Sequence, residues 1–326
     1  MHASSVKPRQ IAFSCAVCVL ICCLVIQPQR YISSVYQGML LFATTVAPAL
    51  FPFFFFTRLL TALGGADAVG KLLSRPVSCL YRAPAVSGYV YVMSVLSGYP
   101  VGSRLIADLY RNGSINAAQA KKISTFTSTS GPLFLVGTVG TLLFRNPTLG
   151  YILMGCHFLG ALLNGLLYRN IGTATPPVCA GDVSSDNSQN GMSGAVWSVF
   201  LVGGYIAVFS MVVDVLVDTG IVTLLSKPLE ALFALTKQPQ ELARGIVISC
   251  IEITRGCQVF AQSGISPAQV LPWVAAMLSF GGFSIGCQSI TFLKECGISF
   301  GFFMRSKCTQ ALISWLITFV VCSMIW

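Results

Sequence analysis

The sequence predicts an all-α polytopic membrane protein built from two similar halves, and three observations support this prediction. Hydrophobic residues make up 55% of the 326-residue chain and charged residues only 9%, whereas about a quarter of a soluble domain is charged. Apolar runs long enough to enter or cross a bilayer recur from Ile11 to Trp326. Several landmarks of the first half also recur, in the same order, in the second half.

Residues 1–35 are predicted to form a retained signal-anchor helix and a following loop. Lys7 and Arg9 precede an apolar run at residues 11–26, as they would in a signal peptide. No small-x-small cleavage site follows this run, so we expect the helix to be kept. The cations in front of it predict a cytoplasmic N-terminus. The polar residues 31–37 are predicted to be a short loop.

Residues 36–170 form the first predicted repeat. It opens with an apolar run at residues 38–63, which Pro48 and Pro52 are expected to bend. An amphipathic stretch at residues 64–82 follows and carries three spaced cations, which indicates a helix lying along the membrane interface.

A re-entrant hairpin is predicted next, with its tip at Ser97-Gly98-Tyr99-Pro100-Val101-Gly102. The rising arm at residues 84–97 would span about 21 Å as a helix, too little to cross an apolar core of about 30 Å. Glycine and proline break the helix, and the freed backbone groups are tolerated only where protein or a water-filled cavity receives them. A harmless kink in a spanning helix remains the alternative.

The first repeat is predicted to close with a broken helix and a full span. Hydroxyl-rich residues 124–131 run directly into an apolar stretch at residues 132–144, and a second apolar run follows at residues 149–168. The free N–H groups at the start of the first stretch would suit an anion, although a plain Ser/Thr helix cap would look the same. The polar residues 171–194 are predicted to be a cytoplasmic linker.

Residues 195–326 repeat this plan. The run Leu72-Leu73-Ser74-Arg75-Pro76 reappears as Leu224-Leu225-Ser226-Lys227-Pro228, and the first tip corresponds in position to Thr254-Arg255-Gly256. The first break corresponds to residues 281–284. An odd number of crossings in each half would place the two halves upside down relative to each other, and discontinuous helices at matching positions of an inverted repeat indicate a transporter.

The charge distribution excludes several other classes of protein. The net charge of +10 comes from 20 Lys and Arg against 10 Asp and Glu. Single cations flank the apolar runs, which fits positive-inside bias and argues against nucleic-acid binding. Most of them, Arg104 and Lys307 included, fall on the inner side if the C-terminus lies outside. The 13 scattered cysteines and the lack of catalytic, phosphate-binding or metal-ligand motifs predict neither an enzyme nor a bound metal or cofactor.

The candidate solute-binding residues come from the two tips and the two breaks, which are expected to meet near the middle of the bilayer. They are Ser97, Gly98, Tyr99, Pro100, Gly102 and Arg104 at the first tip, Ser128, Ser130 and Gly131 at the first break, Glu252, Thr254 and Arg255 at the second tip, and Gly281, Gly282, Ser284 and Gln288 at the second break.

Alternatives remain open for the charged candidates. Arg104 would meet an anion or snorkel to the cytoplasmic interface. Glu252 and Arg255 are spaced to pair on one helical turn, for function or for structure alone. The role of Asp214 is undecided, and His157, with no second histidine nearby, is predicted to be structural.

The two tips, Ser130-Gly131-Pro132-Leu133-Phe134 and residues 281–288 together resemble YlbJ-type sporulation integral membrane proteins, over roughly residues 36–326. This resemblance places the chain with nucleoside-recognition or "gate" domain proteins. It implies a role in moving dipicolinic acid from the mother cell towards the forespore across the outer forespore membrane. Arg255 stands where the family is expected to have a small or amide residue.

Taken together, the residues and the resemblance predict a multi-pass bacterial membrane transporter or facilitator for a small organic anion, with dipicolinate as the expected solute. The lipid bilayer is the other expected partner, and a homo-oligomer is among the alternatives for the assembly. The alternative functions are a non-transporting membrane scaffold for spore formation and a nucleoside or ion gate. Coupling and direction of flux stay open.

Overall fold

The computed structural model describes residues 8–172 and 192–326, and every regular element in these two ranges is a helix. This confirms the predicted all-α class. The first range contains α1 (Pro8–Ile26), α2 (Pro28–Leu41), η1 (Phe42–Val46), α3 (Ala47–Ala62), α4 (Gly65–Tyr81), α5 (Ser87–Ser97), α6 (Val101–Arg111), α7 (Ala117–Ile123), η2 (Phe134–Leu143) and α8 (Pro147–Leu167). The second range contains α9 (Met192–Asp218), α10 (Ile221–Leu235), α11 (Glu241–Ile251), α12 (Ile253–Gln262), α13 (Pro267–Phe280), α14 (Gly282–Leu293), η4 (Lys294–Cys296) and α15 (Phe300–Ile325).

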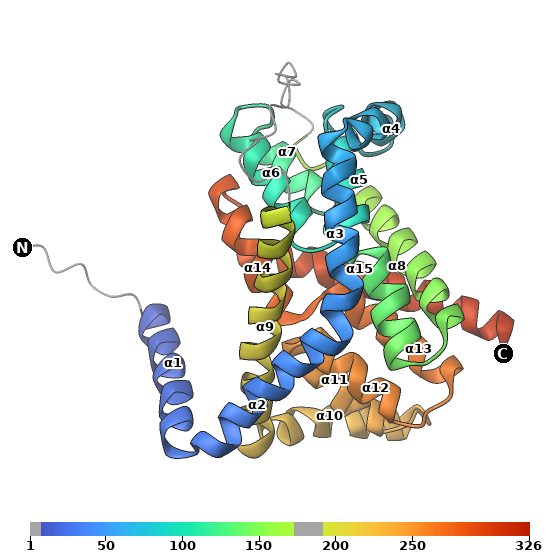
Figure 1. The fold of residues 1–326 in the computed structure, drawn as a ribbon. Helices are drawn as coiled ribbons and strands as arrows, with labels where there is room; N and C mark the ends of the chain where they lie inside the picture. The colour runs from blue at the N-terminus through green and yellow to red at the C-terminus, as the bar shows by residue number, and fades with distance from the viewer. Residues whose placement is uncertain (1–7, 173–191) are drawn as a thin grey trace, which may run out of the picture.

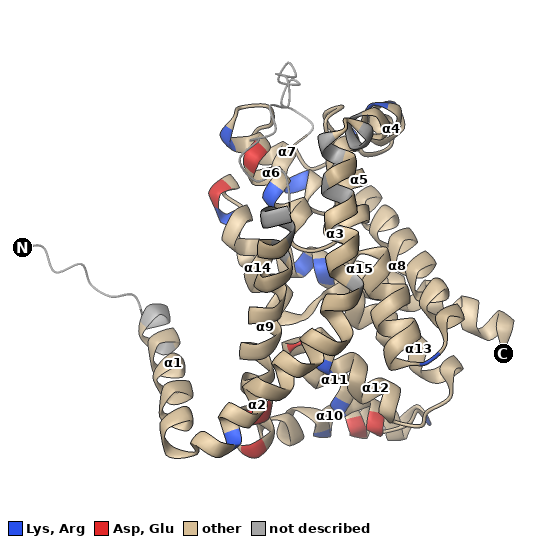
Figure 2. Cartoon of the chain, viewed as in Figure 1, with Lys and Arg blue, Asp and Glu red and all other residues tan. Residues whose placement is uncertain are grey.

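Several of these helices are long and apolar enough to cross a membrane, as predicted for a polytopic protein. Within the described residues they are Pro147–Leu167, Val199–Asp218, Pro267–Cys296 and Phe300–Ile325. A further candidate is the pair Phe13–Ile26 and Pro28–Val46, which is bent by 108°. Figure 2 shows most charged residues gathered towards the two ends of the molecule, as expected for a protein with an apolar belt.

The N-terminal region differs from its prediction in one respect. Residues 31–37, predicted to be a loop, lie inside α2, which starts directly after the sharp bend at Gln27. Pro28 occupies the first turn of α2, where its missing N–H has no intrahelical partner to lose. Helix α1 therefore diverges from the body of the protein, as Figure 1 shows.

The bend expected near Pro48 takes the form of a π-helical turn. Helices α2 and α3 are joined without interruption through η1 at Phe42–Val46. Because Pro48 has no N–H for the carbonyl of Thr44, a local change of helical pitch is a natural accommodation.

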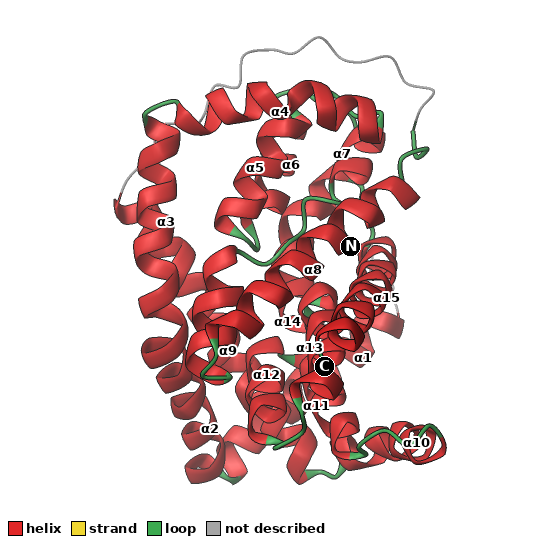
Figure 3. Ribbon diagram, turned by 90° about the vertical axis from the view of Figure 1, so that its right-hand side faces the viewer, coloured by secondary structure: helices red, strands yellow, loops and turns green. Residues whose placement is uncertain are grey.

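The two halves present the same order of elements. Helix α4 in the first half and α10 in the second are amphipathic, and each starts after a glycine in the left-handed conformation, Gly64 at φ 75° and Gly220 at φ 76°. A pair of short helices follows in each case, α5 and α6 or α11 and α12. In Figures 1 and 3, α4 and α10 lie at opposite ends of the molecule.

A close glycine–serine contact holds together each pair of short helices. A Cβ atom on Gly102 would lie 2.2 Å from Ser94 Oγ, and one on Gly256 would lie 1.8 Å from Ser249 Oγ. Both glycines are therefore needed for packing between the arms. Gly102, predicted to present backbone to a solute, serves this packing instead.

Each tip also packs against the break of its own half. Gly98 has φ 69°, and a Cβ atom there would lie 2.4 Å from Gly131 N. Gly282 has φ 73°, and a Cβ atom there would lie 2.6 Å from Ser249 O. The first tip thus meets the irregular residues before η2, and the end of α11 meets the junction of α13 and α14.

The predicted membrane topology can be tested with reporter fusions. Reporter domains that are active on one side of the membrane only should report opposite sides when placed in the linker at residues 171–194 and after Trp326, because α9, α13–α14 and α15 would cross between them. The described residues do not include positions 173–191, so the fusion is the direct measurement. The same side for both reporters would contradict a three-crossing second half.

Candidate functional site

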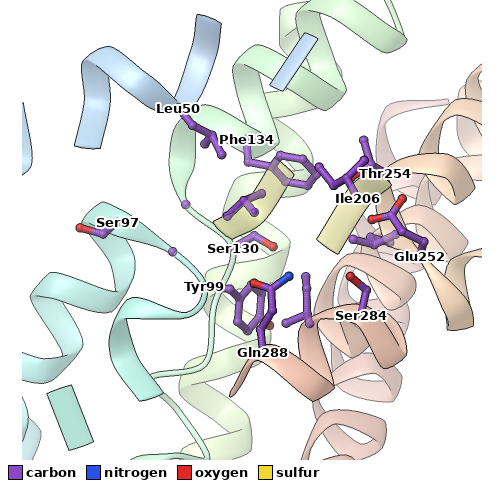
Figure 4. Close-up of a pocket in the computed structure, with 15 residues that line it drawn as sticks. Leu50, Ser97, Tyr99, Ser130, Phe134, Ile206, Glu252, Thr254, Ser284 and Gln288 are labelled. Atoms are coloured by element: carbon purple, nitrogen blue, oxygen red, sulfur yellow. The ribbon is translucent and has the colours of Figure 1, made fainter. Parts of the chain in front are cut away.

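The two tips and the two breaks line one central cavity. Its polar lining is made by Ser97, Gly98, Tyr99, Ser130, Gly131, Glu252, Thr254, Ser284 and Gln288. Apolar side chains from α3, η2, α9, α12 and α14 complete the wall: Leu50, Phe134, Val202, Ile206, Ile253 and Ile285. Figure 4 shows Tyr99, Gln288 and Ser284 gathered on one side of this space and Phe134 on the other. About 50 Å³ of the cavity is open to water-sized molecules.

The first tip is anchored through Tyr99. Its hydroxyl donates to the carbonyl oxygen of Ser128 at 2.8 Å. The side chain of Ser97 points away from the other labelled residues in Figure 4, so at this position the backbone is the part nearest the cavity. Pro100, in a cis peptide bond with Tyr99, is buried and does not line the cavity.

The first break is held by a histidine on α8. His157 is fully buried, and its Nε2 accepts from the Ser130 N–H at 3.0 Å. The Nδ1 atom must then carry the proton, which it donates to Ser279 Oγ at 2.8 Å. Ser279 in turn donates to Ser314 Oγ at 2.8 Å. His157 therefore links the first break to α13 and α15, in agreement with the structural role predicted for it.

The second tip is organised by Glu252, which separates α11 from α12. Its carboxylate accepts from the Arg255 N–H at 2.7 Å and so caps α12. The Glu252 side chain is buried, and it lies on the cavity wall. A carboxylate at this position is stabilised by the free N–H groups and the positive end of the helix dipole.

The predicted side-chain pair of Glu252 and Arg255 is wrong. The Arg255 guanidinium instead binds Asp214 on α9 at 2.9 Å. The Glu252 carboxylate accepts from a backbone N–H of its own helix, and the Arg255 guanidinium pairs with the neighbouring helix α9. This ion pair also gives Asp214 a role: it ties the second tip to α9.

Seven of the predicted binding residues lie outside the cavity wall. Arg104 is partly exposed, and its Nε lies 3.9 Å from Asp108 Oδ2 one helical turn later. This position fits the alternative in which Arg104 extends to the membrane interface. Arg255 is engaged with Asp214. The remaining ones act through backbone geometry, packing or capping next to the wall: Pro100, Gly102, Ser128, Gly281 and Gly282.

Sequence reasoning missed the most unusual residue of the region, Lys307 on α15. Its side chain is buried. Nζ donates to Tyr99 OH at 2.5 Å, to Ser128 O at 2.7 Å and to Gln310 Oε1 at 2.6 Å. The sequence placed Lys307 only among the cations of the inner side and did not predict that its side chain is buried.

A signal for its position was present in the sequence. The buried polar residues Ser306, Gln310, Ser314 and Thr318 of α15 recur every four residues, and Lys307 follows Ser306 directly. This spacing places them on one face of the helix. In a membrane helix a polar stripe of this kind faces protein rather than lipid.

These features define a polytopic helical membrane protein with two broken-helix pairs around a central cavity. Over 310 residues the chain is 28% identical to the sporulation integral membrane protein YlbJ of Bacillus subtilis strain 168, an alignment that covers 87% of this chain and 75% of that protein. The predicted resemblance to YlbJ-type sporulation proteins is thus confirmed. No family model and no solved structure matches the chain, and the wider relation to gate-domain proteins stays a prediction.

The Arg255–Asp214 pair gives a stability prediction. Arg255→Gln and Asp214→Asn should each lower the free energy of unfolding by about 2 kcal/mol, because each leaves one charge unpaired. This is less than the roughly 3–5 kcal/mol of a fully buried pair, because the two side chains are 23% and 13% exposed. The double variant should cost less than the sum of the two. Thermal unfolding of the protein in detergent would measure this coupling.

The ion pair between Arg30 and Asp218 provides a matched control. It joins α2 to the last residue of the same helix α9, one turn after Asp214, with side chains 51% and 30% exposed. Neutralising either partner there should change stability by about 1 kcal/mol or less. Additive costs at Arg255 and Asp214 would show that this pair does not couple the tip to α9.

Proposed function

We propose that the protein is a membrane transporter or facilitator for a small organic anion, organised as an inverted repeat around the central cavity. The observation that carries the proposal is the meeting of four discontinuous segments, two from each half, at one partly polar cavity. Unwound backbone inside a membrane is costly, and transporter sites use it to contact solutes. A scaffold has no such need for it.

The donors on the wall favour an anionic group. Helices α12, α14 and η2 each contribute residues from their first turn, among them Thr254, Ser284 and Phe134. Helix N-termini offer free N–H groups and a partial positive charge. The Glu252 carboxylate, which would repel an anion, is already capped by the start of α12.

The resemblance to sporulation proteins suggests dipicolinate as the solute. The similar Bacillus protein is named for sporulation, and the resemblance implies movement of dipicolinic acid from the mother cell towards the forespore. Dipicolinate is a planar dianion whose carboxylates suit the hydroxyl and N–H donors of the cavity, while Phe134, Ile253 and Ile285 suit the faces of its ring. We therefore propose the outer forespore membrane as the site of action.

The small size of the cavity implies a moving step. Since a water molecule needs about 10–15 Å³ by this measure, the 50 Å³ open to water-sized molecules holds only a few of them. A ring with two carboxylates would require the tips to withdraw from the breaks. The pairs α5–α6 and α11–α12, each a compact unit, are the elements proposed to move.

Uptake into proteoliposomes tests the proposal. Purified protein should accumulate labelled dipicolinate faster than protein-free vesicles, and it should transport nucleosides and divalent metal ions no faster than those vesicles. Uptake of a nucleoside or metal ion instead would favour a gate-type carrier. No uptake of any of these solutes by folded protein would favour the scaffold function.

A single hydroxyl on the wall provides a sharper measurement. Ser284→Ala removes one hydroxyl donor from the wall, and it should weaken dipicolinate binding about 10- to 150-fold, as expected for one lost hydrogen bond to a charged group. The matched control is Thr291→Val, on an exposed face of α14 where the hydroxyl bonds to Cys287 O. Equal binding by the two variants would remove Ser284 from the site.

A further inference from the structure

A buried positive charge lies directly behind the cavity wall. Lys307 contacts Tyr99, whose ring forms part of that wall, and its Nζ lies 5.0 Å from the centre of the ring. Among the ion pairs formed by described residues, none includes Lys307. Its three hydrogen-bond partners are uncharged, so nothing in direct contact neutralises it.

The hydrogen bonds of Lys307 are those of an ammonium group. Three acceptors surround Nζ at 2.5–2.7 Å, namely Tyr99 OH, Ser128 O and Gln310 Oε1. The Tyr99 hydroxyl donates its own proton to Ser128 O and accepts from Nζ. An ammonium has three N–H bonds, one for each of these acceptors.

Two further polar groups of this cluster are unused. Ser128 Oγ and Gln310 Nε2 are buried and have no hydrogen-bond partner among the described residues. Buried polar groups are ordinarily satisfied. Neither group carries a negative charge, so the positive charge of Lys307 is not compensated within this cluster.

The backbone dipoles alone do not set the sign of the field in the cavity. The N-terminal ends of α12 and α14 reach it, but the C-terminal ends of α5, α11 and α13 reach the same region. These opposed ends cancel in part. The wall also carries the Glu252 carboxylate. A net positive potential therefore requires a full positive charge, and the sequence candidates for that charge, Arg104 and Arg255, do not line the cavity.

We infer that Lys307 is the residue that makes the cavity selective for anions, by supplying a fixed positive charge one side chain behind the wall. The inference rests on the proposed function and specifies how the site recognises its solute. Tyr99 separates the ammonium from the solute, so Lys307 acts through the electric field at short range rather than by direct contact. In a low-dielectric interior such a field is only weakly screened.

Gln310 makes a sharp test, since a glutamate there would neutralise Lys307 without removing its hydrogen bonds. Binding to purified protein would be measured for pyridine-2,6-dicarboxylate and for the uncharged pyridine-2,6-dicarboxamide. Lys307→Gln and Gln310→Glu should each lower the preference for the dianion by about tenfold or more, with little effect on the diamide. Arg305→Gln removes an exposed cation two residues away and should change neither.

The outcomes are distinguishable. If the original protein prefers the dianion and both variants keep that preference, the inference fails while the proposed function stands. If the original protein binds neither compound, both fail. Should Lys307→Gln not fold, Gln310→Glu alone decides, because it adds an ion-pair partner and leaves the lysine in place.

Discussion

Unpaired backbone groups inside a membrane are the constraint on which this structure depends. Each helix break creates N–H and C=O groups that lipid cannot satisfy. Side chains from other parts of the chain satisfy them: His157 accepts from Ser130 N–H, Lys307 and Tyr99 donate to Ser128 O, and Glu252 accepts from Arg255 N–H. Thr129 Oγ1 likewise donates to Ser94 O at 3.1 Å. The broken segments are thereby fixed around a cavity instead of being exposed to lipid.

Helix α15 supports this arrangement from behind. Its polar face carries Lys307 and Gln310 to the first tip and break, and Ser314 to the chain of hydrogen bonds that ends at His157. Directly before Lys307, Ser306 accepts from Asn164 Nδ2 at 3.1 Å. A helix of the second half thus stabilises the broken helix of the first half. This dependence couples the two halves in addition to the shared cavity.

Local sequence was sufficient to predict where the helices break and which segments matter. Gly98, Gly281 and Gly282 mark breaks because each has a positive φ, which glycine adopts at the lowest cost. The four predicted segments do meet at one cavity. Predictions about charged side chains were less accurate, because Arg255 pairs with Asp214 and because Lys307, counted only among the inner-side cations, is buried.

The sequence by itself determined the helical class, the apolar spans and the order of elements in each half, because hydrophobicity, helix-breaking residues and amphipathic spacing act over a few turns. Only the tertiary structure decided which partner each buried charge takes. Asp214 and Arg255 are separated by 41 residues, and Lys307 and Tyr99 by 208. The physical reason is that a buried charge is stabilised by whichever groups the packing of distant helices brings within hydrogen-bond distance.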